Sequence, residues 1–428
     1  MNTIIKITPS RIIFLFTFGA CLLFVLMRPV LTYYLTDTVK YIFMIGIISA
    51  LCDGILSLFF RHLSGSDIAE YGLLIIFALY AIISSFSSGG KELLIMTIVR
   101  YLLYSFPIIA VPVLCKRINF NHLFTFLSIF GIIDSTISIY EFITHNVVFK
   151  VYDTMIVVQQ NGALRTFGLN GNYFLLAEIL SLCGLTSLYS YFQQKDKFFL
   201  IAFVWISLGV FSTGTRGYYV SYLLGMVVLY VGSKLEGGFT KSLFMKLLLG
   251  VVVFLFVFYF VAFSNITFGN AAIADVLTRF RSIFNWSTEN ANVMRARAWQ
   301  NSILAWKQNL LLGHGACCTE LDYSGRLLVT ESGVLKRLVE LGLIGTILQY
   351  ATMLFPLFCG FSIYRRSNNR NPLCIWALSI VVCSFVEDII LQMYTGIEFT
   401  IIIWFCIAVI YYFPDKYSFD KINPYATL

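Results

Sequence analysis

The sequence predicts an all-α integral membrane protein, with about twelve transmembrane helices in a single polytopic domain, residues 1–428. Two properties lead to this expectation. Of the 428 residues, 59% are hydrophobic and 12% are charged, about half the charged fraction of a soluble domain. The hydrophobic residues also gather in blocks of about 20, the length that crosses a bilayer as a helix.

Twelve apolar segments follow one another along the chain. The first is too long for the core of a signal peptide and has no clear cleavage site after it, so we expect it to be retained as the first helix. The tenth begins with Lys336 and Arg337, which we expect outside the hydrocarbon. The segments are residues 12–31, 41–60, 70–87, 93–114, 123–144, 172–192, 198–213, 217–233, 246–264, 332–363, 373–393 and 397–413.

Basic residues orient these helices. One set of short connections is positive throughout, whereas the opposite short connections carry little charge; the positive-inside rule then places both termini in the cytoplasm. The positive set contains Lys6, Arg11, Arg61, Lys116, Arg117, Lys195, Lys197, Lys234, Lys241, Lys246, Arg365, Arg366, Arg370, Lys416 and Lys421.

Two longer connections lie on the far side, a medium loop at 145–171 and a large loop at 265–331. Long loops escape the charge rule, so the excess of arginine in the large loop leaves the topology unchanged. A solvated surface and an anionic ligand both explain that excess. Within the loop, apolar residues recur every three or four positions from Ala296 to Leu310, including Trp299 and Trp306. This spacing predicts a helix that lies at the membrane interface or packs on the bundle.

Three arginines of this side stand beside glycines or tight turns: Arg165, Arg216 and Arg295. A guanidinium binds phosphate through paired hydrogen bonds and stays charged at any physiological pH. Each arginine alone could equally face solvent or lipid headgroups. Together, on one face, they favour a site for a phosphate or pyrophosphate.

Charges inside apolar segments are costly and tend to pair. We expect Arg100 to pair with Asp134 at a similar depth, while Glu387 and Asp388 either face a polar cavity or extend to the interface. The remaining charges of this kind are Arg28, Asp53, Glu141 and Glu178.

Glu331 stands where the large loop re-enters the membrane, so it is a candidate general base. Residues 330–332 could instead cap the tenth helix. Cys317 and Cys318 are adjacent and are either two thiols or a strained vicinal disulfide. We find no GxxxxGK[ST] motif and no Cys/His spacing typical of zinc.

In layout and in three local stretches, the chain resembles the O-antigen polymerase and ligase superfamily of bacterial inner-membrane glycosyltransferases. The stretches are "RTFGLNGNYFLLAEIL" from Arg165, "STGTRGYYVSYLLG" from Ser212, and "RARAWQNSILAWKQNLLLGHG" from Arg295 together with "ESGVLKRLVELGLIG" from Glu331. Ligases of this superfamily carry a His-Asn pair before the pattern LxxLxExGxxG. Here Glu331 and Ser332 occupy those two positions, which favours a polymerase.

The resemblance implies a bundle similar to the GT-C glycosyltransferases and a reaction between undecaprenyl-pyrophosphate-linked oligosaccharides at the periplasmic face. It implies inversion at the anomeric carbon, with no nucleotide sugar, metal, other cofactor or nucleic acid. Arg216 and Arg165 would bind pyrophosphate, and Arg295 pyrophosphate or sugar. Glu331 would act as base or orient the acceptor. The further substrate contacts implied are Asn170, Tyr218, Tyr219 and Tyr323.

Three functions stay open at this point: polymerase, ligase that transfers polymer to lipid A-core, and a flippase or another transporter of lipid-linked oligosaccharide. Transporters usually have two similar halves and short loops, whereas the halves of this chain differ. The resemblance also leaves open a polysaccharide chain-length regulator as a partner.

Overall fold

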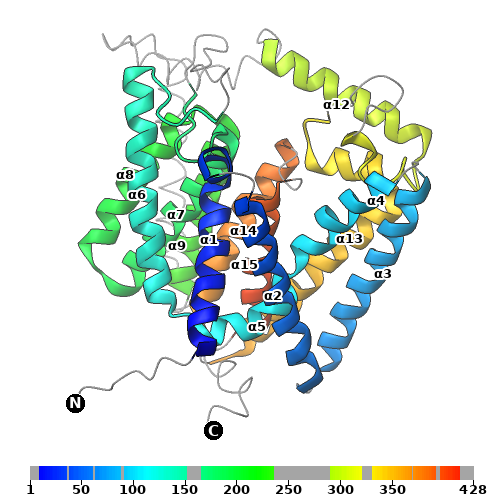
Figure 1. Ribbon diagram of the computed structural model, residues 1–428, viewed down its shortest axis with the longest axis horizontal. Coiled ribbons are helices and arrows are strands. Elements are labelled where there is room, and N and C mark those ends of the chain that lie inside the picture. The colour runs from blue at the N-terminus through cyan, green and yellow to red at the C-terminus, as the bar shows by residue number, and fades with distance from the viewer. Residues whose placement is uncertain are drawn as a thin grey trace.

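The protein folds as a bundle of helices in the computed structural model (Figure 1). The structure describes residues 9–35, 38–60, 63–87, 91–151, 165–235, 290–320, 330–368, 370–391 and 396–414. The predicted segment 246–264 and Tyr323 lie outside the described residues. The other eleven predicted segments coincide with helices. Six spans within the described ranges are long and apolar enough to cross a membrane, so the prediction of a helical membrane protein is confirmed, while a total of twelve spans stays a prediction.

The first half of the bundle contains α1 (Pro9–Leu35), α2 (Thr38–Phe60), α3 (Gly65–Ser87), α4 (Lys91–Thr97), α5 (Pro107–Arg117), α6 (Phe120–Thr144) and α7 (Tyr173–Gln194). The second half contains α8 (Lys197–Ser212), α9 (Arg216–Leu235), α12 (Asn290–Gln308), α13 (Gly333–Arg366), α14 (Leu373–Ile390) and α15 (Ile397–Tyr412).

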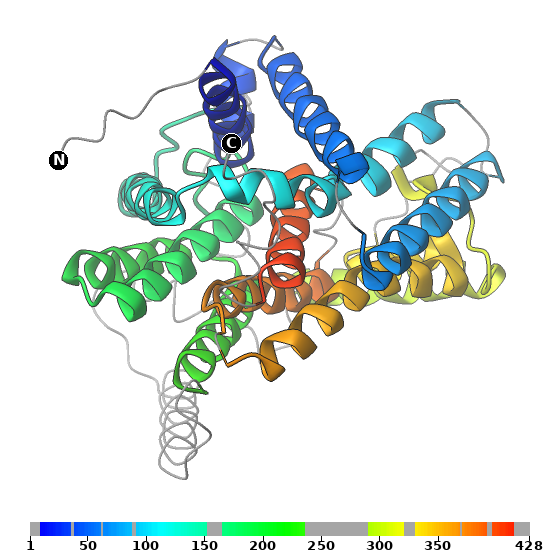
Figure 2. The same ribbon diagram turned by 90° about the horizontal axis from the view of Figure 1, so that it is seen from below.

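Two groups of helices make up the architecture (Figures 1 and 2). In the first, α6, α7 and α8 pack together, and α9 packs against α7 and α14. In the second, α13 packs against α3, and α12 lies across the end of α13. α15 contacts α13, α14 and α5 and so joins the two groups. Trp376 and Trp404 are among the largest side chains fully buried in the core.

The predicted segment 93–114 is not one regular helix. α4 is followed by a π-helical turn, Ile98–Leu102, and a 3₁₀ turn, Leu103–Ser105, before α5 begins at Pro107. Pro107 stands at the first turn of α5, where a missing N–H costs nothing. Arg100 lies in the π turn. A π turn widens the helix locally and is frequent at functional positions.

α13 is interrupted at Gly342, whose φ of 65° and ψ of −171° lie in a region that side chains other than glycine scarcely adopt. The segment 310–315 pairs with this break. Leu343 and Ile344 donate backbone hydrogen bonds to Leu310 and Leu311, and His314 and Gly315 donate to Val339 and Glu340. The backbone groups freed by the break are thereby satisfied, as a membrane-embedded helix requires.

We expect Gly342→Ala to destabilise the protein by roughly 1–3 kcal/mol, the cost of a strained backbone conformation. The added Cβ would also meet the carbonyl oxygen of Leu311, a backbone atom that cannot rotate away. Thermal unfolding of the purified protein in detergent measures this effect. Gly72→Ala is the matched control, because Gly72 is helical and its Cβ would meet nothing within 4 Å. Equal melting temperatures for the two variants would contradict the interpretation.

Candidate functional site

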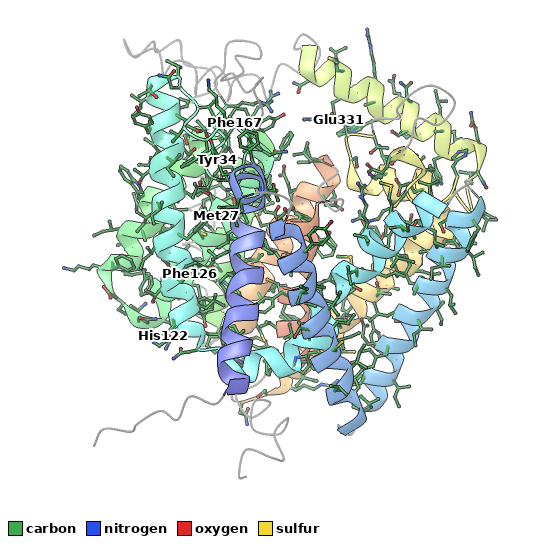
Figure 3. All side chains as sticks on the ribbon, in the orientation of Figure 1. Met27, Tyr34, His122, Phe126, Phe167 and Glu331 are labelled. Atoms are coloured by element: carbon green, nitrogen blue, oxygen red, sulfur yellow. The ribbon has the colours of Figure 1, made fainter. Side chains whose placement is uncertain are left out.

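The predicted arginines and Glu331 come from four separate segments of the chain. Arg165 precedes α7, Arg216 begins α9, Arg295 lies in α12, and Glu331 precedes α13. Phe167, close to Arg165 in the sequence, and Glu331 both lie at the end of the bundle opposite His122 (Figure 3). The segments that carry the candidate residues therefore meet at one end of the molecule.

The segment after Arg165 is held by a carboxylate from α6. Glu141 is wholly buried. Its Oε2 accepts hydrogen bonds from the backbone N–H groups of Phe167 at 2.7 Å and Gly168 at 3.0 Å, and its Oε1 accepts one from Val148 at 2.9 Å. One side chain thus ties both sides of the loop to α6. Sequence analysis treated Glu141 only as a costly charge and missed this role.

Asp134, two turns before Glu141 on the same face of α6, completes the support. Its Oδ1 accepts from the backbone N–H of Leu169 at 2.8 Å, and its Oδ2 accepts from the side-chain amide of Asn170 at 2.9 Å. The predicted ion pair between Arg100 and Asp134 is therefore wrong. Arg100 pairs instead with Glu320, because helix depth does not determine which helices are neighbours. Asn170 is buried in this support, and its role as a substrate contact stays a prediction.

Arg165 lies over the ring of Tyr173, with its guanidinium carbon 4.1 Å from the ring centroid. Among the described residues, its buried Nε has no hydrogen-bond partner. Burial lowers the pKa of the Arg165 guanidinium, and the charges of Arg216 and Arg295 lower it further. The guanidinium of Arg165 therefore interacts electrostatically with both other arginines.

Arg216 is positioned by the tight turn between α8 and α9. Gly214 has a φ of 66° in this turn, where a side chain would be strained. Thr213 closes the turn, since its Oγ1 accepts from the backbone N–H of Thr215 at 3.3 Å. The Arg216 Nη2 donates to Oδ1 of Asn292 on α12 at 3.3 Å. This contact connects the two segments that carry Arg216 and Arg295.

Glu331 pairs with Arg295, with 3.6 Å between Oε2 and Nε. Its backbone has a φ of 50°, and its carbonyl accepts from the indole N–H of Trp299 at 3.0 Å. The cap of α13 is formed by Ser332, whose Oγ accepts from the N–H of Leu335 at 3.5 Å. Ser332 therefore caps α13, and the half-buried Glu331 side chain pairs with Arg295.

A carboxylate that sequence analysis left unassigned lies beneath this site. Glu387 of α14 is wholly buried, and Oγ of Ser221 donates to its Oε2 at 3.3 Å. The charge of Arg295 acts on it. Tyr218 is also buried, at 1% exposure, and interacts electrostatically with Glu178 and Glu387. Its ring therefore points into the bundle here, and its predicted contact with sugar stays a prediction.

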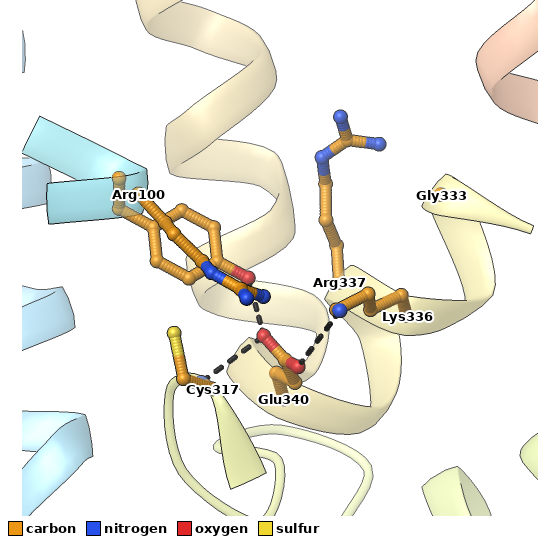
Figure 4. A pocket seen from close by; sticks show the side chains of 7 residues that line it. Arg100, Cys317, Gly333, Lys336, Arg337 and Glu340 are labelled. Carbon is orange, nitrogen blue, oxygen red and sulfur yellow. Dashed lines mark hydrogen bonds and ion pairs between the residues drawn. The ribbon is translucent and has the colours of Figure 1, made fainter. Parts of the chain in front are cut away.

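A second charged cluster secures the end of α13 and lines a small pocket (Figure 4). Lys336 and Arg100 both pair with Glu320. Glu340 accepts from the hydroxyl of Tyr101 at 2.5 Å and from the backbone N–H of Cys317 at 3.1 Å. Burial would raise the pKa of Glu320, but Lys336 and Arg100 outweigh it and lower that pKa.

Four further points concern the sequence predictions. Asp388 is buried and pairs with Arg337 at 2.5 Å, so neither Glu387 nor Asp388 extends to the interface. Cys317 and Cys318 are separate buried thiols. Burial is the main cause, and the charge of Glu340 the second, that raises the pKa of Cys317 to about 12. Helix α12 packs on α13. In the described ranges, no three His, Cys, Asp or Glu side chains gather as metal ligands.

Guanidinium groups can bind an anion jointly, and paired hydrogen bonds favour one with phosphate geometry. Residues 201–350 match the model of the O-antigen ligase family. The matched range includes Arg216, Arg295 and Glu331. No curated protein matches the chain. The family match confirms the resemblance to the O-antigen polymerase and ligase superfamily.

We expect Glu141→Ala to release the segment that carries Arg165. Three backbone N–H groups would lose their acceptor, and each unsatisfied buried group costs roughly 1–3 kcal/mol. Limited trypsin digestion measures the effect, because Lys150 and Arg165 are cleavage sites in this loop. Digestion there should become several-fold faster. Tyr140→Phe, an exposed change on the same helix, should leave the rate unchanged. Protection of the loop in Glu141→Ala would contradict the assigned role.

Proposed function

We propose that the protein is a polymerase of lipid-linked oligosaccharides. It transfers a growing chain from undecaprenyl pyrophosphate to a sugar hydroxyl of the next lipid-linked unit, at the periplasmic face of the bacterial inner membrane. The reaction inverts the anomeric carbon and uses neither metal nor nucleotide sugar, since the pyrophosphate is already a good leaving group.

The convergence of Arg165, Arg216 and Arg295 carries this proposal. The charges of Arg216 and Arg295 act on Arg165, which supports a shared site where a pyrophosphate would be stabilised as it gains charge. The stacking of Arg165 on Tyr173 orients its guanidinium plane. Arg216 is oriented by Asn292 and Arg295 by Glu331. Each arginine thus has a neighbouring group that limits its rotation before any ligand binds.

The roles follow from these positions. Arg165 and Arg216 bind pyrophosphate, and Arg295 binds pyrophosphate or sugar. Glu331 accepts a proton from the acceptor hydroxyl or orients that hydroxyl. We assign a minor role, as contacts to sugar or pyrophosphate, to Asn170, Tyr218 and Tyr323. Asn170 and Tyr218 are buried among protein groups.

A ligase that transfers the polymer to lipid A-core is the second candidate, and the family match supports a polymerase and a ligase equally. The residues Glu331 and Ser332 favour the polymerase, because ligases of the superfamily have a His-Asn pair there. A flippase is the third candidate. Deletion in the native host separates the three. Loss of a polymerase leaves one repeat unit on the surface glycolipid, loss of a ligase leaves none, and loss of a flippase traps units on the cytoplasmic side.

Arg165→Ala and Arg216→Ala should each lower polymer formation about 10- to 100-fold, the loss expected for hydrogen bonds to a charged group. Arg216→Lys should keep only part of the wild-type polymer formation, because lysine cannot bind phosphate in a bidentate manner. Complementation of the deletion strain, read as the chain-length pattern at matched protein levels, measures these effects.

Arg297→Ala is the matched control. Arg297 lies on α12 two positions from Arg295, so it projects from another face of the helix, and it is exposed. Its removal should leave the chain-length pattern unchanged. Normal chain lengths in both Arg165→Ala and Arg216→Ala would refute the assignment of the site.

A further inference from the structure

Glu387 lies beneath the arginines, in contact with the first turn of α9. A Cβ added at Gly217 would come within 2.5 Å of Oε1 of Glu387. Glu387 therefore packs on the backbone directly after Arg216. It lies at the end of α14 and is fully buried. The absence of a side chain at Gly217 gives the carboxylate this position.

The carboxylate of Glu387 is incompletely satisfied. Ser221 donates to Oε2 at 3.3 Å, while Oε1 has no hydrogen-bond partner among the described residues. On the side of the proposed site, the positive charge of Arg295 acts on Glu387. A buried carboxylate with one bare oxygen and a nearby cation can exist with or without a proton, depending on what neutralises the cation.

On its other side, Glu387 faces further acidic groups. Glu178 of α7 is 4% exposed, and neither of its carboxyl oxygens has a hydrogen-bond partner within the described part of the chain. It lines a small cavity together with Tyr218, Ser181 and Ser384. Tyr218 also has an unpartnered hydroxyl in the described structure. Glu178 and Tyr218 thus bring unpartnered polar groups to the lining of one cavity.

The charges around Glu387 come from several helices. Arg295 of α12 is cationic, whereas Glu178 of α7 adds negative charge, and Glu178 in turn interacts with Glu398 of α15. Asp388 of α14 is neutralised by Arg337 of α13 at 2.5 Å. Tyr218 contributes from α9. Three carboxyl groups in an apolar bundle cannot all be ionised without compensation.

We propose that Glu387 is the proton-accepting group of the arginine site, ionised while the site is empty and protonated when a pyrophosphate fills it. The proposal rests on the proposed function, which supplies the pyrophosphate. With the site empty, the arginine charges compensate an ionised Glu387. A bound pyrophosphate takes over those charges, and Glu387 then neutralises itself by binding a proton.

The transfer step then uses the second carboxylate of the site. The hydroxyl oxygen of the acceptor forms a bond to the anomeric carbon, and the bond from that carbon to the pyrophosphate oxygen breaks. The leaving pyrophosphate keeps the electron pair and gains one negative charge, while the hydroxyl proton passes to Glu331, which loses one. The net charge of the site therefore stays constant. Glu387 already holds the proton taken up on ligand binding and keeps it during the transfer.

Calorimetry with farnesyl pyrophosphate tests the coupling without any knowledge of the sugars. The full-length protein is titrated in nanodiscs, in two buffers of different ionisation enthalpy, which gives the number of protons bound per ligand. Wild type should take up roughly one proton more than Glu387→Gln. The affinity of wild type for the probe should fall as pH rises. Relative to the affinity of Glu387→Gln, it should fall by up to about tenfold for each pH unit. The probe's own ionisation is the same for both proteins and cancels.

Glu70→Gln is the matched control. Glu70 is buried on α3, and in the described structure both its oxygens also lack hydrogen-bond partners. Its variant should keep the wild-type proton balance, and Glu387→Asp should keep most of it. An equal proton balance in wild type and Glu387→Gln would overturn the role of Glu387 while leaving the anion site intact. No binding of the probe to wild type would instead overturn the proposed function. If Glu387→Gln does not fold, the pH dependence of wild-type affinity decides alone. The coupling is overturned if that affinity changes with pH only as much as the ionisation of the probe explains.

Discussion

Polar groups inside an apolar bundle need partners from the chain itself, because lipid offers none. Glu141 shows the consequence most directly, since one carboxylate accepts three backbone N–H groups and thereby determines the course of the loop before α7. The break of α13 at Gly342 shows it for backbone groups, which pair with the segment 310–315. Both contacts place a loop at the end of the bundle where the arginines meet.

Some of the groups that this requirement leaves incompletely satisfied lie near the arginines. Among the described residues, the Nε of Arg165, both oxygens of Glu178 and Oε1 of Glu387 lack hydrogen-bond partners. All three side chains belong to the set of charges that act on one another through Arg295 and the acidic groups below it. Cations lie above and carboxyl groups below. Such a separation of charge favours an anion at the arginines and a proton at the acids.

Much of the site was accessible from the sequence, because its arginines break the pattern of their surroundings. Arg165, Arg216 and Arg295 stand beside glycines or tight turns in the sequence, and in the structure the charges of Arg216 and Arg295 act on Arg165. The residues that hold the segments of these arginines could not be predicted from the sequence. Asp134 looked like a partner for Arg100 at equal depth, yet it holds Asn170 and Leu169. Equal depth limits which charges can meet, but the neighbours of each helix decide which do.

The sequence by itself determined the helical membrane architecture, since hydrophobic blocks of bilayer length permit no other use of so apolar a chain. It also predicts which side of the membrane carries the arginines, through the distribution of basic residues among the connections. Only the tertiary structure decided that Glu387 lies against Gly217 beneath those arginines. The two residues are far apart in the chain, and their contact depends on the packing of α9 against α14, which hydropathy does not encode.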